Sequence, residues 1–412
     1  MTGSVYILGG YQTDFSANWA RSGREIADGM REVLEQGLAA TQLSPQELDT
    51  AHVGNFAAEL FCNQGHLGGV LAAALPDLAG IPASRHEGAC ASGSLAALAA
   101  SAEIEAGRYG LAAVVGIEQM RNVPGDEAAK LIGATAMWAG HECVDVKYPW
   151  PHVFSELAGE YDRRYGLKAE HLARIAEINF GNARRNPNAQ TRRWEFTDRS
   201  FQQDDVANPV IDGRMRKQDC GQITDGAAIV FLASEAVARE WARQRGRSLN
   251  SLARIAGWGH RTAPITYQAK VAMSEGQPFV FPFVRATITD AYRRAGITGV
   301  EQLSGIETHD CFTSTEYMAI DHFGITPPGQ SWQAIENGDI EIGGRIPVNP
   351  SGGLIGLGHP VGATGVRMLL DCYKQVTGTA GAYQVENAER FATLNVGGSA
   401  TTTVSFVVER AS

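Results

Sequence analysis

Hydrophobic and polar positions along the chain alternate between short strand-like runs and longer helix-like stretches. In the first half they predict strands at 4–8, 51–56 and 111–117 and helices at 23–40 and 91–107. The pair Gly9-Gly10 is expected to end the first strand, because glycine punctuates regular structure. Strands and helices in this order predict an α/β protein, with a sheet that carries helices on both faces.

The same alternation returns in the second half of the chain. It predicts strands at 251–258, 305–308, 391–395 and 401–408 and helices at 313–322 and 362–376. Both halves run from a strand through a tight turn to a long helix rich in small residues, and then to another strand. This echo indicates an internal duplication, with an N-terminal half at 1–250 and a C-terminal half at 251–412.

The stretch at about 120–245 interrupts this pattern with polar and basic residues. Its basic positions are Arg184, Arg185, Arg192, Arg193, Arg214, Arg216 and Lys217. It closes with a turn and a strand at 224–232. We interpret the stretch as a loop domain inserted into the first half. Its arginines could bind phosphates, but most of them are expected to be solvent-exposed surface residues.

Composition narrows the class of protein. Of the 412 residues, 44% are hydrophobic and 19% are charged, which allows a large core and excludes global disorder. The net charge of −10 argues against general nucleic-acid binding. No apolar run reaches about 18 residues, so no membrane span is expected. The first twenty residues show no secretory pattern, and the last four are not a Ser-Lys-Leu address. The cysteine usage favours reduced thiols in a cytoplasmic protein.

The cysteines lack the spacing of a disulfide framework or a metal site. The six cysteines are Cys62, Cys90, Cys143, Cys220, Cys311 and Cys372. They form no CxxC pair, and the chain has no HExxH motif. We therefore expect reduced thiols and no bound metal. A cysteine with a function here would act as a nucleophile or a proton carrier.

Cys90 lies among small residues at the start of the predicted 91–107 helix, in the sequence Glu-Gly-Ala-Cys-Ala-Ser-Gly-Ser. A thiol at a helix N-terminus meets unpaired N–H groups, which favour the thiolate and could hold an oxyanion. Small neighbours would let a substrate carbonyl reach the sulfur. The alternative is a buried structural cysteine.

His359 lies in a glycine-rich stretch at 349–365, just before the last predicted helix. Such a turn brings backbone close to a ligand, and an imidazole there can accept a thiol proton near neutral pH. A hydrogen-bonded histidine in a structural turn and a phosphate-binding loop are the alternatives. The stretch matches neither GxGxxG after a strand nor GxxxxGK followed by Ser or Thr, so the nucleotide interpretation is weak.

Two further stretches follow predicted strands. His309, Asp310 and Cys311 come directly after the 305–308 strand, where α/β sheets place reactive groups. A satisfied His–Asp pair at a helix N-terminus is the alternative for them. The turn Asn-Val-Gly-Gly-Ser at 395–399 can offer backbone N–H donors, but alone it is only a turn between strands.

In this order and at these separations, the four stretches resemble the thiolase superfamily, and the resemblance covers most of the chain. It includes Val-Gly-Asn-Phe at 53–56 and Asp-Gly-Ala-Ala at 225–228. Cys90 matches the cysteine that accepts the acyl group, and Gly-His-Pro at 358–360 matches the motif whose histidine activates that cysteine. The resemblance implies two βαβαβαββ halves in a five-layered αβαβα fold with an inserted loop domain.

Two departures make the chain similar to the sterol-carrier-protein-2 type of thiolase. His-Asp-Cys-Phe at 309–312 replaces the usual Asn-Glu-Ala-Phe, and Asn-Val-Gly at 395–397 replaces the C-terminal Cys-x-Gly turn. In that subgroup Cys311 would carry the proton at Cα and His309 would polarise the thioester oxygen. His359 would deprotonate Cys90, and the N–H groups of Cys90 and Gly397 would hold the tetrahedral oxyanion.

The resemblance also implies an activity. The chain would be an acyltransferase that cleaves or forms 3-oxoacyl-CoA through an acyl-cysteine, with acyl-CoA and CoA as substrates and no further cofactor. It would act in lipid metabolism as a homodimer or homotetramer. The acyl chain length and branching, the direction in the cell and the residues that contact CoA stay open.

Four other functions compete with this one. The first is a C-acyltransferase of the same fold that acts on small acceptors other than CoA. The second is a decarboxylating ketosynthase, which the His-Asp-Cys-Phe and Gly-His-Pro contexts disfavour. The third is an aldolase-like relative that works with a small OB-fold partner protein, and the retained Cys90 counts against it. The fourth is a non-enzymatic lipid-binding protein, in which Cys90→Ala would leave function intact.

Overall fold

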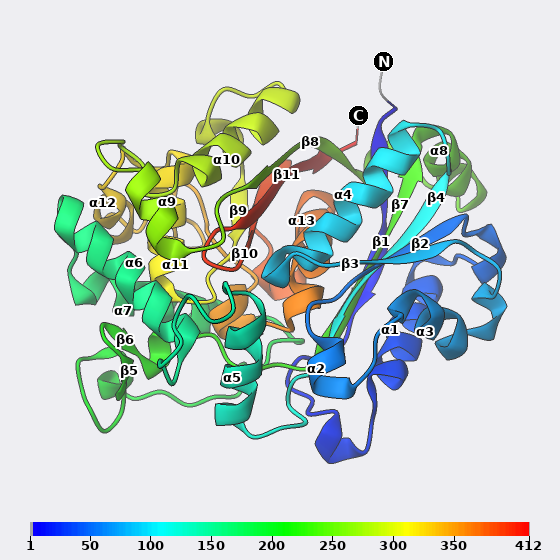
Figure 1. Cartoon of the computed structure of the whole chain (residues 1–412). Coiled ribbons are helices and arrows are strands. Elements are labelled where there is room, and N and C mark those ends of the chain that lie inside the picture. Colours follow the sequence, from blue (N-terminus) through cyan, green and yellow to red (C-terminus); the bar gives the residue numbers. More distant parts are fainter. Residues whose placement is uncertain (1–2, 412) are drawn as a thin grey trace.

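Strands from both halves of the chain join in one large sheet. The computed structural model describes residues 3–411, and within them nine strands form a sheet of order β3-β2-β4-β7-β1-β8-β11-β10-β9 (Figure 1). The strands are β1 Val5–Gln12, β2 Thr50–Gly54, β3 Ala83–His86, β4 Leu111–Glu118, β7 Gly226–Ser234, β8 Ala253–Thr262, β9 Gly305–Thr308, β10 Arg390–Gly397 and β11 Thr402–Arg410.

The predicted duplication is visible in the strand topology. In the first half β2 pairs in parallel with β3 and β4, and β7 pairs antiparallel with β4 and β1. In the second half β9 and β10 are parallel, and β11 pairs antiparallel with β10 and β8. A single parallel bridge between Ile306 and Val348 takes the place of a β3 counterpart. The halves meet where β1 pairs antiparallel with β8.

Two helices form the central layer, and the first of them is rich in small residues. α4 Ser92–Glu105 packs on β2 and β4, α13 Thr364–Thr377 packs on β10 and β11, and the two helices contact each other (Figure 1). The contact is close, because a Cβ at Gly365 would lie 2.3 Å from the Ser94 nitrogen. α1 Ile26–Thr41 and α3 Leu67–Ala74 cover the first half outside, and α10 Pro282–Arg294 covers the second. The β3–β1 part of the sheet and the β8–β9 part thus lie on either side of the two central helices, with further helices outside each part. The layers are therefore αβαβα, which confirms the predicted fold class.

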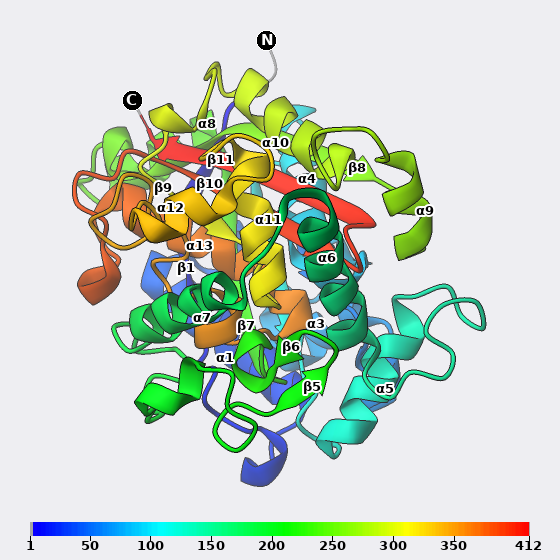
Figure 2. The same cartoon turned by 90° about the vertical axis from the view of Figure 1, so that its left-hand side faces the viewer.

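The segment between β4 and β7 carries the elements predicted as an insertion. They are α5 Gly125–Thr135, α6 Pro149–Tyr165, α7 Ala169–Ala183, β5 Val210–Asp212 and β6 Met215–Arg216. α6 and α7 contact α11 Thr313–Phe323, which belongs to the second half, and α7 also contacts α12 Ser331–Glu336 (Figure 2). The remaining helices are α2 Ala58–Cys62, α8 Glu235–Gln244 and α9 Tyr267–Met273. The domain boundaries drawn from the sequence stay predictions.

One local prediction was wrong. The pair Gly9-Gly10 does not end the first strand, because β1 continues to Gln12 with a register shift between Ile7 and Gly9. A Cβ at Gly10 would lie 1.9 Å from the Ile229 carbonyl oxygen of β7. Glycine is therefore needed here for close strand pairing rather than for a break.

The sequence contains no apolar run long enough to predict a membrane span. Within residues 3–411, none of the helices combines the length and the apolar character needed to cross a bilayer.

Candidate active site

Cys90 is held at the junction between β3 and α4. Ala89 adopts a left-handed conformation, with φ of 52°, in a short 3₁₀ turn that leads into α4. The Ser92 hydroxyl accepts the Gly88 N–H at 3.0 Å and donates to the Ala89 carbonyl at 2.6 Å. This turn fixes the thiol at the N-terminal end of the central helix, where the two halves meet.

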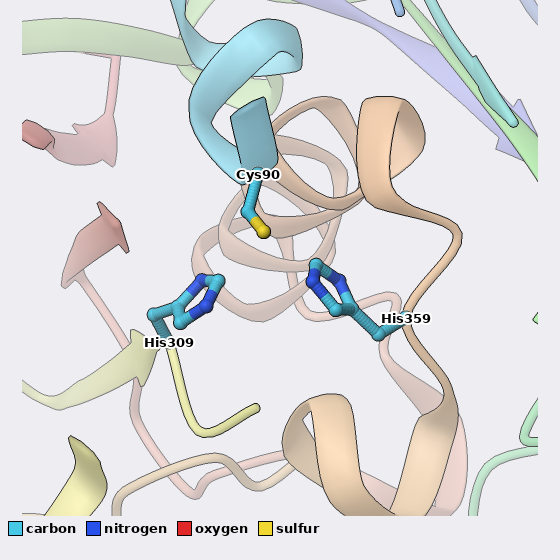
Figure 3. Close-up of side chains that lie close together, drawn as sticks. All are labelled: Cys90, His309 and His359. Atoms are coloured by element: carbon cyan, nitrogen blue, oxygen red, sulfur yellow. The ribbon is translucent and has the colours of Figure 1, made fainter. Parts of the chain in front are cut away.

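Two histidines from the second half converge on Cys90. His309 follows β9, and His359 follows the glycine-rich loop that precedes α13. One ligand atom of each of the three side chains lies within 4.8 Å of the others. Figure 3 shows both imidazoles turned toward the sulfur. The rings are nearly perpendicular, at 89°, with centroids 5.3 Å apart. Residues separated by more than 200 positions in the sequence therefore form one site.

The hydrogen bonds of His359 leave Nε2 free to accept a proton. Its Nδ1 lies 2.6 Å from the Thr364 hydroxyl, which itself donates to the Pro360 carbonyl at 3.2 Å. Because that hydroxyl proton is already engaged, Thr364 accepts from Nδ1–H. Nε2 then carries a lone pair, and it is buried without a hydrogen-bond partner among residues 3–411. His359 can act as a base toward a group beside it.

His309 has the opposite arrangement. The Ser94 hydroxyl donates to Asn395 Oδ1 at 2.8 Å, which turns the Asn395 amide NH₂ toward His309 Nδ1 at 3.3 Å. Nδ1 therefore accepts, and the ring proton lies on Nε2. One imidazole offers an acceptor and the other a donor. A metal held by Cys90 and both histidines would need a lone pair on each Nε2, so this network suits proton transfer better than metal ligation.

Burial keeps the pair of Cys90 and His359 neutral. It raises the pKa of Cys90 to about 12, while the nearby Gly398 N–H and the residue's own backbone act in the opposite direction. Burial, with the Arg367 charge, lowers the pKa of His359 to about 3. The pKa of His309 also lies well below its usual value, chiefly because of burial. At neutral pH the site therefore holds a thiol beside a neutral imidazole, not an ion pair.

A cavity of about 400 Å³ opens onto the thiol. Cys90, Cys311, His359 and Gly398 line it, together with an apolar wall that includes Met120, Ile132, Trp150, Phe154, Phe312 and Val361. The Phe154 and Phe312 rings stack with centroids 4.8 Å apart. The cavity can therefore hold a hydrophobic acyl chain against the sulfur.

Cys311 is buried in the same cavity. Its sulfur lies 4.0 Å from the Thr315 hydroxyl, and burial raises the pKa of its thiol well above the usual value. Cys220 also lines the cavity, although its sequence context gave no sign of this. The two thiols of the sequence prediction, Cys90 and Cys311, thus face one space.

The turn after β10 faces Cys90 through two glycines. Gly397 belongs to the β10–β11 ladder, and a Cβ there would lie 2.0 Å from the Gly88 carbonyl oxygen. Gly398 lines the cavity, and its N–H lowers the pKa of the Cys90 thiol. The oxyanion donors predicted from the sequence, Cys90 and Gly397, stay a prediction, and the structure adds Gly398 as a neighbour of the sulfur.

Asp310 holds the loop that carries His359. Its carboxylate accepts the backbone N–H of Leu354 at 2.5 Å and of Ile355 at 3.3 Å, and the side-chain amide of Asn179 at 2.9 Å. It is fully buried. The His-Asp-Cys-Phe stretch therefore links three parts of the site, because Asp310 ties its own loop to the glycine-rich loop and to α7.

Sequence reasoning missed Glu118, which joins the two halves beneath the site. Its carboxylate accepts the N–H groups of Phe56 at 2.9 Å, Ala57 at 3.1 Å and Gly362 at 3.0 Å, and the Asn55 amide at 2.9 Å. A carboxylate at the end of the apolar run that forms β4 was the available signal.

We expect Glu118→Gln to lower the free energy of unfolding by about 2–3 kcal/mol, because an NH₂ group would face N–H donors that now meet an acceptor. Denaturant unfolding measures the change. Glu240→Gln on the exposed face of α8 is the control and should change stability by less than about 0.5 kcal/mol. Equal effects of the two substitutions would contradict a structural role for Glu118.

Comparisons with known proteins cover nearly the whole chain. The thiolase N-terminal domain matches residues 5–236, and the thiolase C-terminal domain-like family matches residues 266–410. The acetyl-CoA acetyltransferase of Methanothermobacter thermautotrophicus is 31% identical over 98% of this chain and 99% of its own. Sterol carrier protein 2 of Homo sapiens is 28% identical over 93% of this chain and 68% of its own.

Solved structures share the fold at lower identity. The Ltp2-ChsH2(DUF35) aldolase superposes with a TM-score of 0.79 at 20% identity, over 99% of this chain and 98% of that one. Human mitochondrial 3-ketoacyl-CoA thiolase in complex with CoA gives 0.71 at 15% identity, over 100% and 99%. The family matches span both halves and the sequence relatives cover the whole site, and on this evidence the chain belongs to the thiolase family.

Proposed function

We propose that this chain transfers acyl groups between CoA thioesters through a thioester on Cys90. The observation that carries the proposal is the approach of the Cys90 sulfur to within 4.8 Å of an imidazole nitrogen of His359, whose Nε2 is a free acceptor. A nucleophile beside an oriented base is the arrangement that covalent acyl transfer requires.

In the first half-reaction the Cys90 sulfur attacks the 3-oxo carbonyl while its proton passes to His359 Nε2. The N–H groups of Cys90 and Gly397 stabilise the oxyanion, and Gly398 is a further donor on the same turn. The bond between the carbonyl carbon and Cα then breaks, and Cys311 protonates Cα. The leaving acetyl-CoA enolate keeps its oxygen near His309 Nε2–H, the donor tautomer that Asn395 favours.

In the second half-reaction CoA takes the acyl group from Cys90. Its thiol passes its proton to the Cys311 thiolate and attacks the acyl carbonyl. The C–S bond to Cys90 then breaks, and His359 returns its proton to the Cys90 sulfur. The net reaction is 3-oxoacyl-CoA + CoA ⇌ acyl-CoA + acetyl-CoA. CoA as the single co-substrate without a further cofactor, a homo-oligomeric assembly and a cytoplasmic location are parts of the same proposal.

The test of this function is thiolysis of acetoacetyl-CoA. With CoA present, the 3-oxo absorbance should fall at a rate that depends on CoA concentration, and acetyl-CoA should accumulate at two molecules per substrate. Cys90→Ser is the matched control. Loss of absorbance without CoA, or none with it, would overturn the proposal, and a panel of 3-oxoacyl-CoA chain lengths then defines the preferred acyl group.

The neutral state of Cys90 and His359 predicts the pH dependence of thiol reactivity. Because the pKa of Cys90 is raised to about 12, its thiolate fraction should increase tenfold per pH unit at all lower pH values. Alkylation of Cys90 by iodoacetamide is therefore expected to accelerate steadily from about pH 6 to about pH 9. Peptide mapping follows alkylation at Cys90 itself. A rate that stops rising within this pH range would indicate a thiolate–imidazolium pair instead.

A second candidate function is carbon–carbon cleavage of the aldolase kind, with a small OB-fold partner protein. The reason to consider it is the TM-score of 0.79 to the Ltp2-ChsH2(DUF35) aldolase, which is higher than the 0.71 to the human thiolase. Cys90 in a cavity with a base argues for acyl transfer, because retro-aldol cleavage needs no acyl-cysteine. Incubation with a 3-hydroxyacyl-CoA without CoA separates the two: an aldehyde or ketone product would favour the aldolase function.

A further inference from the structure

A lysine is buried behind the turn that faces Cys90. Lys270, on α9, has only 3% of its surface exposed. Its ammonium donates to the Ser399 hydroxyl at 2.7 Å and to the Ile265 carbonyl at 2.9 Å. Within residues 3–411 no carboxylate lies within ion-pair distance of it. Burying an unpaired charge is costly, so its place needs a reason beyond packing.

The groups around Lys270 are mostly apolar. It borders a cavity of about 200 Å³ with Ala263, Met273, Phe281, Pro282, Phe283 and Ala400. Gln277 and Ser399 are the neutral polar neighbours, and Glu142 is the charged group that acts on it. Burial lowers the pKa of Lys270 to about 7, and Glu142 works in the opposite direction.

The turn that Lys270 contacts adopts an unusual backbone. Gly398 has a φ of 63° and Ala400 a φ of 64°, and a left-handed conformation is costly for alanine. The Ile265 carbonyl accepts from both Lys270 and the Thr401 hydroxyl, the latter at 3.3 Å. Lys270 therefore ties the middle of this turn to the segment that already holds its end.

We propose that Lys270 is a positioning residue that holds the 398–400 turn so that the Gly398 N–H faces the Cys90 sulfur. The proposal rests on Cys90 as the nucleophile of the proposed function. Lys270 acts through Ser399 and has no contact with the acyl group. The Lys270 amine is suited to this, because its Nζ contacts the Ser399 hydroxyl and the Ile265 carbonyl at the same time.

The test compares Lys270→Met with Ser399→Ala. Both should slow alkylation of Cys90 at fixed pH about tenfold and lower the rate of acylation about 10- to 100-fold, with the KM for acyl-CoA little changed. The double variant should be no slower than the slower single one, because both break the same contact. Gln277→Leu lies in the same cavity, and among residues 3–411 the Gln277 side chain has no hydrogen bond to the turn. It is the matched control and should react like the original protein.

Stability supplies a readout that separates positioning from packing. An unfolded lysine titrates near 10.4 and the pKa of Lys270 is about 7, so the folded state binds fewer protons between these values. The melting temperature of the original protein should therefore gain a contribution that rises with pH from about 7 to about 10. Lys270→Met should lose that slope and melt no lower at pH 7.

Two results would overturn the proposal. One is alkylation of Cys90 at the original rate in both Lys270→Met and Ser399→Ala. The other is an equal loss in Gln277→Leu, which would assign the effect to the cavity. If Lys270→Met fails to fold, Ser399→Ala alone decides. Alkylation needs no acyl-CoA, so a failed thiolase function and a failed Lys270 role remain distinguishable.

Discussion

Cys90→Ser is expected to lower acyl transfer by at least about 1,000-fold, the scale of losing a nucleophile. A hydroxyl has a pKa above that of a thiol and is a weaker nucleophile, so the same imidazole activates it far less than it activates the Cys90 thiol. The second imidazole beside position 90, that of His309, presents its Nε2–H as a donor and does not replace the base. Substrate should still bind, because the cavity keeps its shape.

The measurement is exchange of the acetyl group between acetyl-CoA and free pantetheine, followed with purified protein. Cys62→Ala is the control, because Cys62 lies outside the cavity against Gln119 and should leave exchange unchanged. Exchange within tenfold of the original rate in Cys90→Ser would contradict a nucleophilic role for the sulfur.

Cys311→Ala is expected to separate the two kinds of chemistry. Acetyl exchange, which moves no proton at Cα, should keep its rate within a few-fold. Cleavage of acetoacetyl-CoA should fall by about 100- to 10,000-fold, the usual value of a positioned acid or base. Cys311 is suited to that role because it is buried in the cavity that holds Cys90, and its thiol keeps its proton at neutral pH.

The control for this experiment is Cys311→Ser, which restores a proton donor of similar size. It should recover part of the cleavage rate, and alanine none of it. Equal losses of exchange and cleavage in Cys311→Ala would contradict the division of labour, because the substitution would then have disturbed Cys90 itself. Hydrogen exchange at Cα of acetyl-CoA in deuterated water reports the same step independently.

Much of the fold could be predicted from the hydrophobic pattern. The strand at 305–308 and the helix beginning at residue 313 lie where the pattern puts them. The first strand was misread at Gly9-Gly10, where the glycines allow β7 to approach closely. A close contact between distant strands leaves no mark in a local pattern.

The candidate site was only partly readable from the sequence. Motifs identified Cys90, His309 and His359, and the structure brings them together. The residues that support them were not readable, because their roles depend on contacts across the fold. Glu118 meets Gly362 across 244 positions, and Lys270 meets Ser399 across 129. No spacing rule connects such pairs.

The most direct test of the central claim is rapid-quench mass spectrometry with peptide mapping after mixing with acetyl-CoA. The original protein should acquire one acetyl group, on the peptide that contains Cys90. His359→Asn, which keeps a polar side chain but removes the base, should acquire it about 100-fold or more slowly. An acetyl group on another residue, or equal rates in the two proteins, would contradict the account.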